Sequence, residues 1–114
     1  MDRRLRLLAL ALAALFALLA TLQFAHAQAP RPFAAGDAKA GAVMHEKDCV
    51  ACHVRRVGGD GSAMYTRADR RVTTPAKLKA QVAACNTQLG AGYFPEEEEH
   101  LSAYLDLQYY KFKD

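Results

Sequence analysis

A five-residue stretch, Cys49-Val50-Ala51-Cys52-His53, constrains this chain more than any other. It places two thiols about one helical turn apart and an imidazole directly after the second. Two thiols at this separation can form thioethers with the two vinyl groups of a haem, and the histidine then lies beneath the iron as its proximal ligand. Cys-x-x-Cys-His is the attachment signal for a c-type haem. The sequence therefore predicts one covalent haem c, held by Cys49, Cys52 and His53.

Other interpretations of a Cys-x-x-Cys pair find less support. Without the histidine, the motif would indicate a thioredoxin-like redox site or half of a zinc site. The chain has no second Cys-x-x-Cys and no His-x-x-His pair that could complete a zinc site. A chance match on a buried helix is the structural alternative.

The first 27 residues have the three parts of a secretory signal peptide. Three arginines lie within the first six residues, residues 7–22 are apolar apart from Thr21, and Ala25-His26-Ala27 is a small-residue cleavage signature. The apolar run of 16 residues falls short of the roughly 20 that span a bilayer. We expect residues 1–27 to be removed on export to the periplasm. An uncleaved anchor in the inner membrane, formed by residues 7–22, is the alternative.

Cleavage would leave a small and nearly neutral protein. Of the 15 Lys and Arg, 12 remain, against 11 of the 12 Asp and Glu, which gives 87 residues a net charge of +1. Neither this charge nor any motif indicates a nucleic-acid partner. A chain of this length forms one domain with a thin core. An apolar haem would supply the missing core, as disulfides or metals do in other small domains.

Within the mature chain, a linker precedes the domain. Residues 28–36 carry two prolines among small residues and predict a flexible linker. Residues 37–114 are expected to form the cytochrome c domain. Its middle part, residues 54–73, has three glycines and no clear periodicity, which predicts an irregular loop. A loop of this length needs a surface to pack on, and the haem edge can supply it.

Two helices are predicted on either side of this loop. The first, over 38–49, begins at Asp37 as N-cap and runs into the haem motif. Its Gly41 costs roughly 1 kcal/mol relative to alanine and indicates the close approach of another helix. The second helix, over 75–89, has proline at its first position and glycine after its last. Its apolar stripe at helical spacing is formed by Leu78, Val82, Cys85 and Leu89.

A third helix begins at Pro95, and the four glutamates of its first turn complement the helix dipole. We read these glutamates as a solvated helix start. The buried face is expected to carry Leu101, Tyr104, Leu105 and Tyr109. The aromatic tail over residues 109–113 is expected to fold back onto the domain. His45 and His100 are interpreted as helix-surface residues rather than iron ligands.

Two segments that flank the haem motif resemble a class I bacterial cytochrome c. They are Asp37-Ala-Lys-Ala-Gly41 before the motif and Pro95-Glu-Glu-Glu-Glu with Leu101-Ser-Ala-Tyr104-Leu105 after it. The resemblance covers nearly the whole mature chain. It implies a small all-α fold of three to four helices wrapped around the haem, whose first and last helices cross where Gly41 meets Tyr104. Family members usually carry an aromatic residue four positions after this glycine, where this chain has His45.

The resemblance also implies a methionine on the distal side of the iron, and here the chain departs from the family. The mature chain has only Met44 and Met64, and neither lies between the second helix and Pro95. We expect Met44 to pack in the core. Met64 lies in the loop that covers the proximal side in this family, where packing against the porphyrin is favoured over iron ligation.

Candidates for the sixth ligand remain near the expected distal position. The segment Cys85-Asn86-Thr87-Gln88 resembles a subgroup of high-spin cytochromes that bind oxygen or nitric oxide beside a distal asparagine. Asn86, Met64 and Cys85 therefore stay open as possible iron ligands. Cys85 can instead be a small buried residue, an intermolecular disulfide partner or a functional thiol.

Residues 55–79 are strongly basic. They carry seven basic residues against Asp60 and Asp69, a net charge of +5 in a nearly neutral protein. The seven are Arg55, Arg56, Arg67, Arg70, Arg71, Lys77 and Lys79. A basic rim around an exposed haem edge would attract an acidic redox partner. One or two of the arginines can instead pair with the haem propionates.

Together these features predict a periplasmic monohaem c-type cytochrome that carries single electrons between redox partner proteins and is not an enzyme. A haem protein that binds or senses O2 or NO is one alternative, because the distal methionine is missing. An accessory subunit that relays electrons within a larger oxidoreductase is another.

Overall fold

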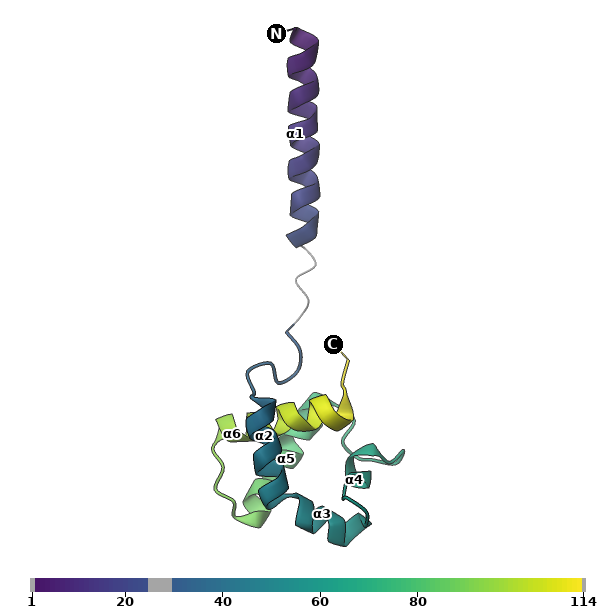
Figure 1. The fold of residues 1–114 in the computed structure, drawn as a ribbon, viewed down its shortest axis with the longest axis vertical. Helices are drawn as coiled ribbons and strands as arrows, with labels where there is room; N and C mark the ends of the chain where they lie inside the picture. The colour runs from purple at the N-terminus through teal and green to yellow at the C-terminus, as the bar shows by residue number, and fades with distance from the viewer. Residues whose placement is uncertain (1, 25–29, 114) are drawn as a thin grey trace.

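The structure, a computed structural model, describes residues 2–24 and 30–113. Every regular element in these residues is helical, and they contain no strand (Figure 1). The predicted all-α class is confirmed, and the wrapping around a haem stays a prediction. The expected cleavage site at Ala25-His26-Ala27 and the first two residues of the expected linker lie outside the described residues.

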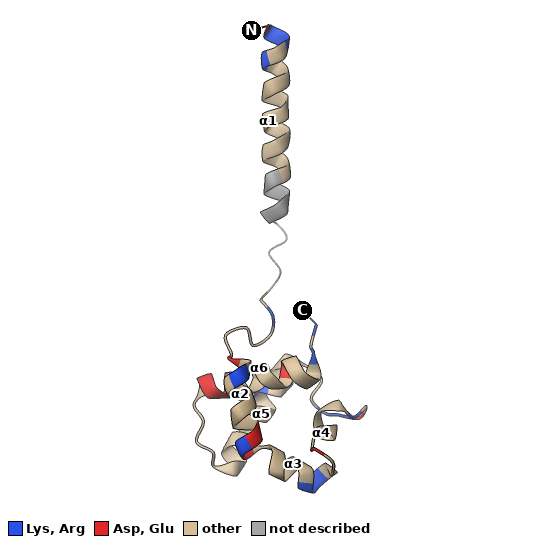
Figure 2. Cartoon of the chain, in the orientation of Figure 1, with Lys and Arg blue, Asp and Glu red and all other residues tan. Residues whose placement is uncertain are grey.

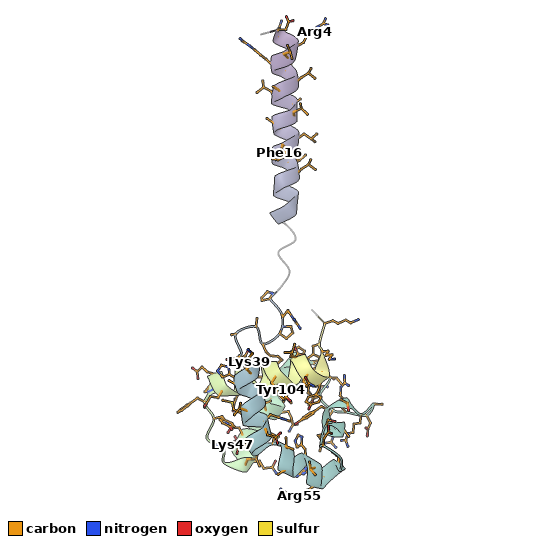
Figure 3. All side chains as sticks on the ribbon, viewed as in Figure 1. Arg4, Phe16, Lys39, Lys47, Arg55 and Tyr104 are labelled. Carbon is orange, nitrogen blue, oxygen red and sulfur yellow. The ribbon has the colours of Figure 1, made fainter. Side chains whose placement is uncertain are left out.

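Helix α1 (Arg3–Phe24) covers the arginine-rich start and the apolar run. Alanine and leucine, which dominate this stretch, are strong helix formers. The side chains of residues 2–19 are exposed, and Figure 3 shows Arg4 and Phe16 projecting from the helix. Within the described part of the chain, no helix is long and apolar enough to cross a membrane.

The domain is organised by the contact between α2 (Ala38–Asp48) and α6 (Pro95–Leu105). At Gly41, an added Cβ would overlap the backbone carbonyl of His100 and lie 2.9 Å from the Cβ of Tyr104. Only glycine fits there, and Figure 3 labels Tyr104 where the two helices meet. The predicted approach of the first and last helices at Gly41 and Tyr104 is confirmed.

The first turn of α2 is fixed from two directions. The Asp37 carboxylate accepts hydrogen bonds from the backbone amides of Lys39 at 2.8 Å and Ala40 at 3.2 Å, as expected of an N-cap. The backbone amide of Asp37 itself donates to His100 Nδ1 at 2.9 Å. The half-buried His100 therefore ties the start of α2 to α6.

The last four residues of the Cys-x-x-Cys-His motif lie on a helix separate from α2, and Cys49 is the N-cap of that helix. Helix α2 ends at Asp48, one residue before the predicted end, and α3 (Val50–Val57) carries Cys52 and His53. The expectation of an irregular loop over residues 54–73 is wrong in part, because α3 continues to Val57 and α4 (Ala63–Thr66) follows. Gly58, Gly59 and Gly61 have positive φ and form the turn between α3 and α4. The glycines of this segment therefore lie between two helices.

Helix α5 (Pro75–Leu89) has the predicted ends. The Thr74 hydroxyl accepts from the amide of Lys77 at 3.2 Å, and Gly90 closes the helix in the left-handed conformation. The predicted helix and its apolar stripe are confirmed, since all four residues of the stripe line one cavity. Leu78 and Val82 are buried, whereas Leu89, in the last turn, is exposed. Cys85 is half-buried.

The hydrophobic core is thin. Its buried apolar members are Tyr65, Val72, Leu78, Val82, Leu101, Leu105 and Tyr110. After α6, the π-helical turn η1 (Asp106–Tyr110) buries Tyr110, and Phe112 stacks on that ring at 5.3 Å. The prediction that the aromatic tail folds back is confirmed. Met44 packs against the same core, also as predicted.

The close approach at Gly41 yields a direct test. We expect Gly41→Ala to lower the free energy of unfolding by about 1–3 kcal/mol or more, because the new methyl must push α6 away. Val43→Ala on the same helix is the matched control, since Val43 is 70% exposed, and its effect should stay within about 0.5 kcal/mol. Denaturant unfolding measures both. Equal stability of Gly41→Ala and the wild type would contradict the observed contact.

Candidate functional site

A cavity of about 720 Å³ opens inside the domain, and its wall includes all three predicted haem-binding residues, Cys49, Cys52 and His53. Cofactor and ligand sites commonly have volumes of ~300–1,000 Å³. Apolar side chains from α5 and α6, among them Leu78 and Leu101, form much of the remaining wall. The Cys-x-x-Cys-His motif therefore faces a partly open space large enough for a cofactor.

His53 is held tightly at the cavity wall. Its ring centroid lies 4.9 Å from that of Tyr65, and an added Cβ on Gly61 would lie 2.8 Å from the Cβ of His53. Gly61, at φ +82°, thus lets the chain after α3 pass directly over this histidine. Burial, and secondarily the charge of Arg56, lowers the pKa of His53, so the imidazole is neutral at neutral pH. A neutral imidazole is the form that binds metals.

The Nδ1 atom of His53 is buried without a hydrogen-bond partner among the described residues. A buried polar atom without a partner costs free energy, and most such atoms in native proteins are satisfied. Because Nδ1 is buried, this atom does not itself open onto the cavity. The expected role of His53 as an iron ligand is supported instead by the position of this residue on the cavity wall.

The two thiols of the motif are half-buried and free in this structure. Burial raises the pKa of Cys49 to about 11, with smaller contributions from Cys85, Asp48 and Cys52. Cys49 therefore stays protonated at neutral pH when no metal is bound. Within the described residues, no group of three or more His, Cys, Asp or Glu side chains is arranged to hold a metal ion by itself. Two thiols beside one imidazole fit a haem better than a bare metal.

The cavity also has charged residues that could face haem carboxylates. Arg56, Arg67 and Arg71 contribute to its wall. Asp48 is the acidic residue there, and it already accepts a hydrogen bond from the Tyr93 hydroxyl. A haem carries two propionates, and guanidinium groups pair well with carboxylates. The donor set, the apolar wall and these arginines together fit the predicted cofactor.

Asn86 lines the cavity, but its side chain is fully engaged. Its Nδ2 donates to the Tyr93 carbonyl at 2.9 Å and to Glu98 Oε1 at 2.8 Å, and its Oδ1 accepts from the Tyr93 amide at 3.1 Å. These bonds join α5 to the segment that follows it and to α6. Asn86 could bind iron only by giving them up. Glu98, read from the sequence as solvated, is one of its partners.

The other two candidates for the sixth ligand lie on different elements. Met64 lines the cavity from α4, next in sequence to Tyr65, whose ring contacts His53. Cys85 lines it from α5, and its sulfur accepts a hydrogen bond from Gln81 Nε2 at 3.3 Å. A single long contact to sulfur is weaker than the three bonds of Asn86. Cys85 is thus the candidate on α5 whose side chain is more easily released.

His45 is the residue that sequence analysis placed wrongly. It is buried, with 5% of its surface exposed, instead of lying on the helix surface. Because it follows Gly41 by four residues, it lies on the same face of α2 and points toward α6. Its Nε2 is 2.9 Å from the Tyr65 hydroxyl, and its ring is 5.1 Å from that of Tyr104. The helical spacing from Gly41 was the signal that could have predicted this burial.

The basic segment is largely exposed. Arg70 is the half-buried exception, and its guanidinium lies 5.6 Å from the centre of the Tyr110 ring. Arg67 forms an ion pair with Asp69 at 3.5 Å. Figure 2 shows blue at the last turn of α3, away from the red first turn of α6. The basic end of α3 and the acidic start of α6 thus lie on different parts of the domain surface.

Comparisons with protein-family models, with curated proteins and with solved structures found no match.

The buried His45 predicts a specific loss of stability in acid. Burial, and secondarily the charge of His53, lowers the pKa of His45 from 6.5 to about 4. The unfolded chain therefore takes up a proton at a higher pH than the folded chain does. The free energy of unfolding is therefore not reduced by His45 above pH 6.5, where the imidazole is neutral in both states. It decreases as the pH falls from 6.5 toward 4, by up to about 3 kcal/mol by linkage.

Denaturant unfolding at several pH values measures this loss. The double variant His45→Phe/Tyr65→Phe is the control, because it removes the imidazole without leaving a lone hydroxyl, while the carboxylates titrate in both proteins. We expect the wild type to lose more stability than the double variant between pH 6.5 and 4. Identical pH profiles would show that His45 is not buried as a neutral ring.

Proposed function

We propose that this protein is an exported monohaem c-type cytochrome that carries single electrons between redox partners in the periplasm. The observation that carries the proposal is the presence of Cys49, Cys52 and His53 on the wall of one cavity. The attachment motif and the export signal add independent support from the sequence.

The side chains around the cavity have distinct roles in this proposal. A bound haem supplies one-electron redox chemistry. Cys49 and Cys52 anchor it through thioethers, and His53 holds the iron from the proximal side. Apolar residues such as Leu78 and Leu101 keep water away from the ring, which affects the reduction potential. No substrate chemistry is needed, so we propose a carrier and not an enzyme.

A gas-binding haem protein is the second candidate. It is favoured by the engagement of Asn86 in three hydrogen bonds and by the location of Met64 beside the residue that packs on His53. If neither residue ligates the iron, only the weakly held Cys85 remains of the three candidates. An iron with no strong sixth ligand can bind a diatomic gas.

The visible spectra of the wild type and of His53→Ala test the proposal. We expect the full chain, produced with haem-attachment machinery, to show a haem spectrum that survives denaturation, because thioethers do not dissociate. His53→Ala should change this spectrum and lower the melting temperature, since it removes the proximal ligand. His100→Ala is the matched control for the spectrum alone, because it removes another half-buried histidine outside the cavity wall but also breaks the hydrogen bond that ties α2 to α6. A chain without covalent haem, or a His53→Ala spectrum equal to the wild type, would refute the proposal.

Carbon monoxide separates the two candidate functions. A low-spin spectrum that carbon monoxide leaves unchanged favours the electron carrier. A high-spin spectrum that shifts with carbon monoxide favours gas binding. Cys85→Ala then reports on the distal side: conversion of a low-spin spectrum to a high-spin one would identify Cys85 as the sixth ligand.

The basic segment predicts how the carrier meets its partner. We expect electron transfer to an acidic partner to slow as salt is raised, because the Debye length falls from ~30 Å at 0.01 M to ~8 Å at 0.15 M. Stopped-flow rates at several ionic strengths measure this effect. The double variant Arg55→Gln/Arg56→Gln should flatten the salt dependence, and Glu96→Gln, on the exposed first turn of α6, should not. A wild-type rate that does not depend on salt would exclude steering by these charges.

A further inference from the structure

Tyr65 and His45 form a buried polar pair for which electron carriage alone has no use. Both residues have 5% of their surface exposed, and the Tyr65 hydroxyl is 2.9 Å from His45 Nε2. With His45 protonated on Nδ1, the hydroxyl donates to Nε2. This is the distance at which one group can take a proton directly from another.

The pair adjoins the haem motif. The Tyr65 ring lies 4.9 Å from the ring of His53, and Tyr65 itself lines the cavity that we assign to the haem. Tyr65 therefore combines a short path to the expected redox centre with a proton acceptor already in place. The second property matters because a phenol that loses an electron becomes a strong acid and must release its proton.

Further tyrosines continue from this pair. The ring of Tyr109 lies 4.9 Å from that of Tyr65, and the ring of Tyr104 lies 6.1 Å from that of Tyr109. Both of these outer tyrosines are half-buried, whereas Tyr65 is buried. The cluster thus connects the cavity wall to residues that solvent can reach.

Resting on the proposed haem, we propose that Tyr65 is a redox-active side chain that gives one electron back to a haem oxidised by hydrogen peroxide, with His45 as its proton acceptor. Hydrogen peroxide would take two electrons from the haem and two protons from solvent, and would leave as two water molecules. Tyr65 returns one of the two electrons, its O–H bond breaks, and the proton moves to His45 Nε2. A neutral tyrosyl radical beside an imidazolium remains, and the second electron comes from the reduced redox partner.

Two other tyrosines on the cavity wall are weaker candidates for the radical site. The Tyr93 hydroxyl donates to the Asp48 carboxylate, so it also has a proton acceptor, but it is only half-buried. Tyr110 is buried, and its hydroxyl has no hydrogen-bond acceptor among the described residues. Of these three tyrosines, Tyr65 is the one that is buried, has a proton acceptor and also contacts the ring of His53.

The test mixes the purified haem form of the full chain with hydrogen peroxide and freezes it for electron paramagnetic resonance. We expect a tyrosyl radical in the wild type, its loss in Tyr65→Phe, and its retention in the control Tyr93→Phe. His45→Phe should lower the yield of the radical, because the proton then has no acceptor. Melting curves of the variants establish that each is folded.

A second measurement needs no substitution. With histidine labelled with nitrogen-15, a radical on Tyr65 should show coupling to the nitrogen of His45, whereas one on Tyr93 lies beside a carboxylate and should not. A haem-loaded protein that forms no tyrosyl radical, or a radical that shows no such coupling or survives in Tyr65→Phe, would overturn the inference. A chain without covalent haem would instead refute the proposed function, so the two failures are distinguishable.

Discussion

The close approach of α2 and α6 at Gly41 is the contact on which the rest of the domain depends. Because residue 41 has no side chain, the backbone of α6 at His100 comes against α2 directly. Gly36, just before α2, meets the backbone of Glu99 and the side chain of Ala103 at a similarly short distance. Two glycines thus fix the start of α2 on α6. This sets the direction in which the chain leaves α2 and enters the haem motif at Cys49.

The arrangement leaves a space that the protein's own side chains do not fill. Protein interiors are usually packed to crystal-like density, and an internal void costs free energy in proportion to its size. Here a cavity of about 720 Å³ lies beside a core in which Leu78 and Ser102 are the largest almost fully buried side chains. This cavity is partly open to solvent, and a bound group in it would complete the small core. The same consideration makes haem attachment and folding interdependent in our proposal.

Local signals account for the parts that could be predicted from the sequence. Asp37, Thr74 and Gly90 act within one turn of their own helix, so the start of α2 and both ends of α5 follow from their neighbours in sequence. Gly41 was predictable because a glycine inside a helix needs a packing reason. The spacing from Gly41 could have predicted the burial of His45 but not its partner. The hydrogen bonds of His45, Asn86 and Tyr65 could not be predicted, since each depends on a partner at least seven residues away in sequence. The thiols and histidine of the site were identified by spacing alone, whereas the cavity they face is a property of the whole fold.

His45 shows how a polar ring in the core is compensated elsewhere in the fold. An aromatic hydrocarbon ring at this position would fill the space near Tyr104 without any polar atom to satisfy. An imidazole there loses its hydration, and the Tyr65 hydroxyl offsets part of that cost. The compensation is mutual, because the phenol also needs an acceptor once it is buried. His45 and Tyr65 therefore form one unit, and a change at either position leaves the other unsatisfied at the wall that holds His53.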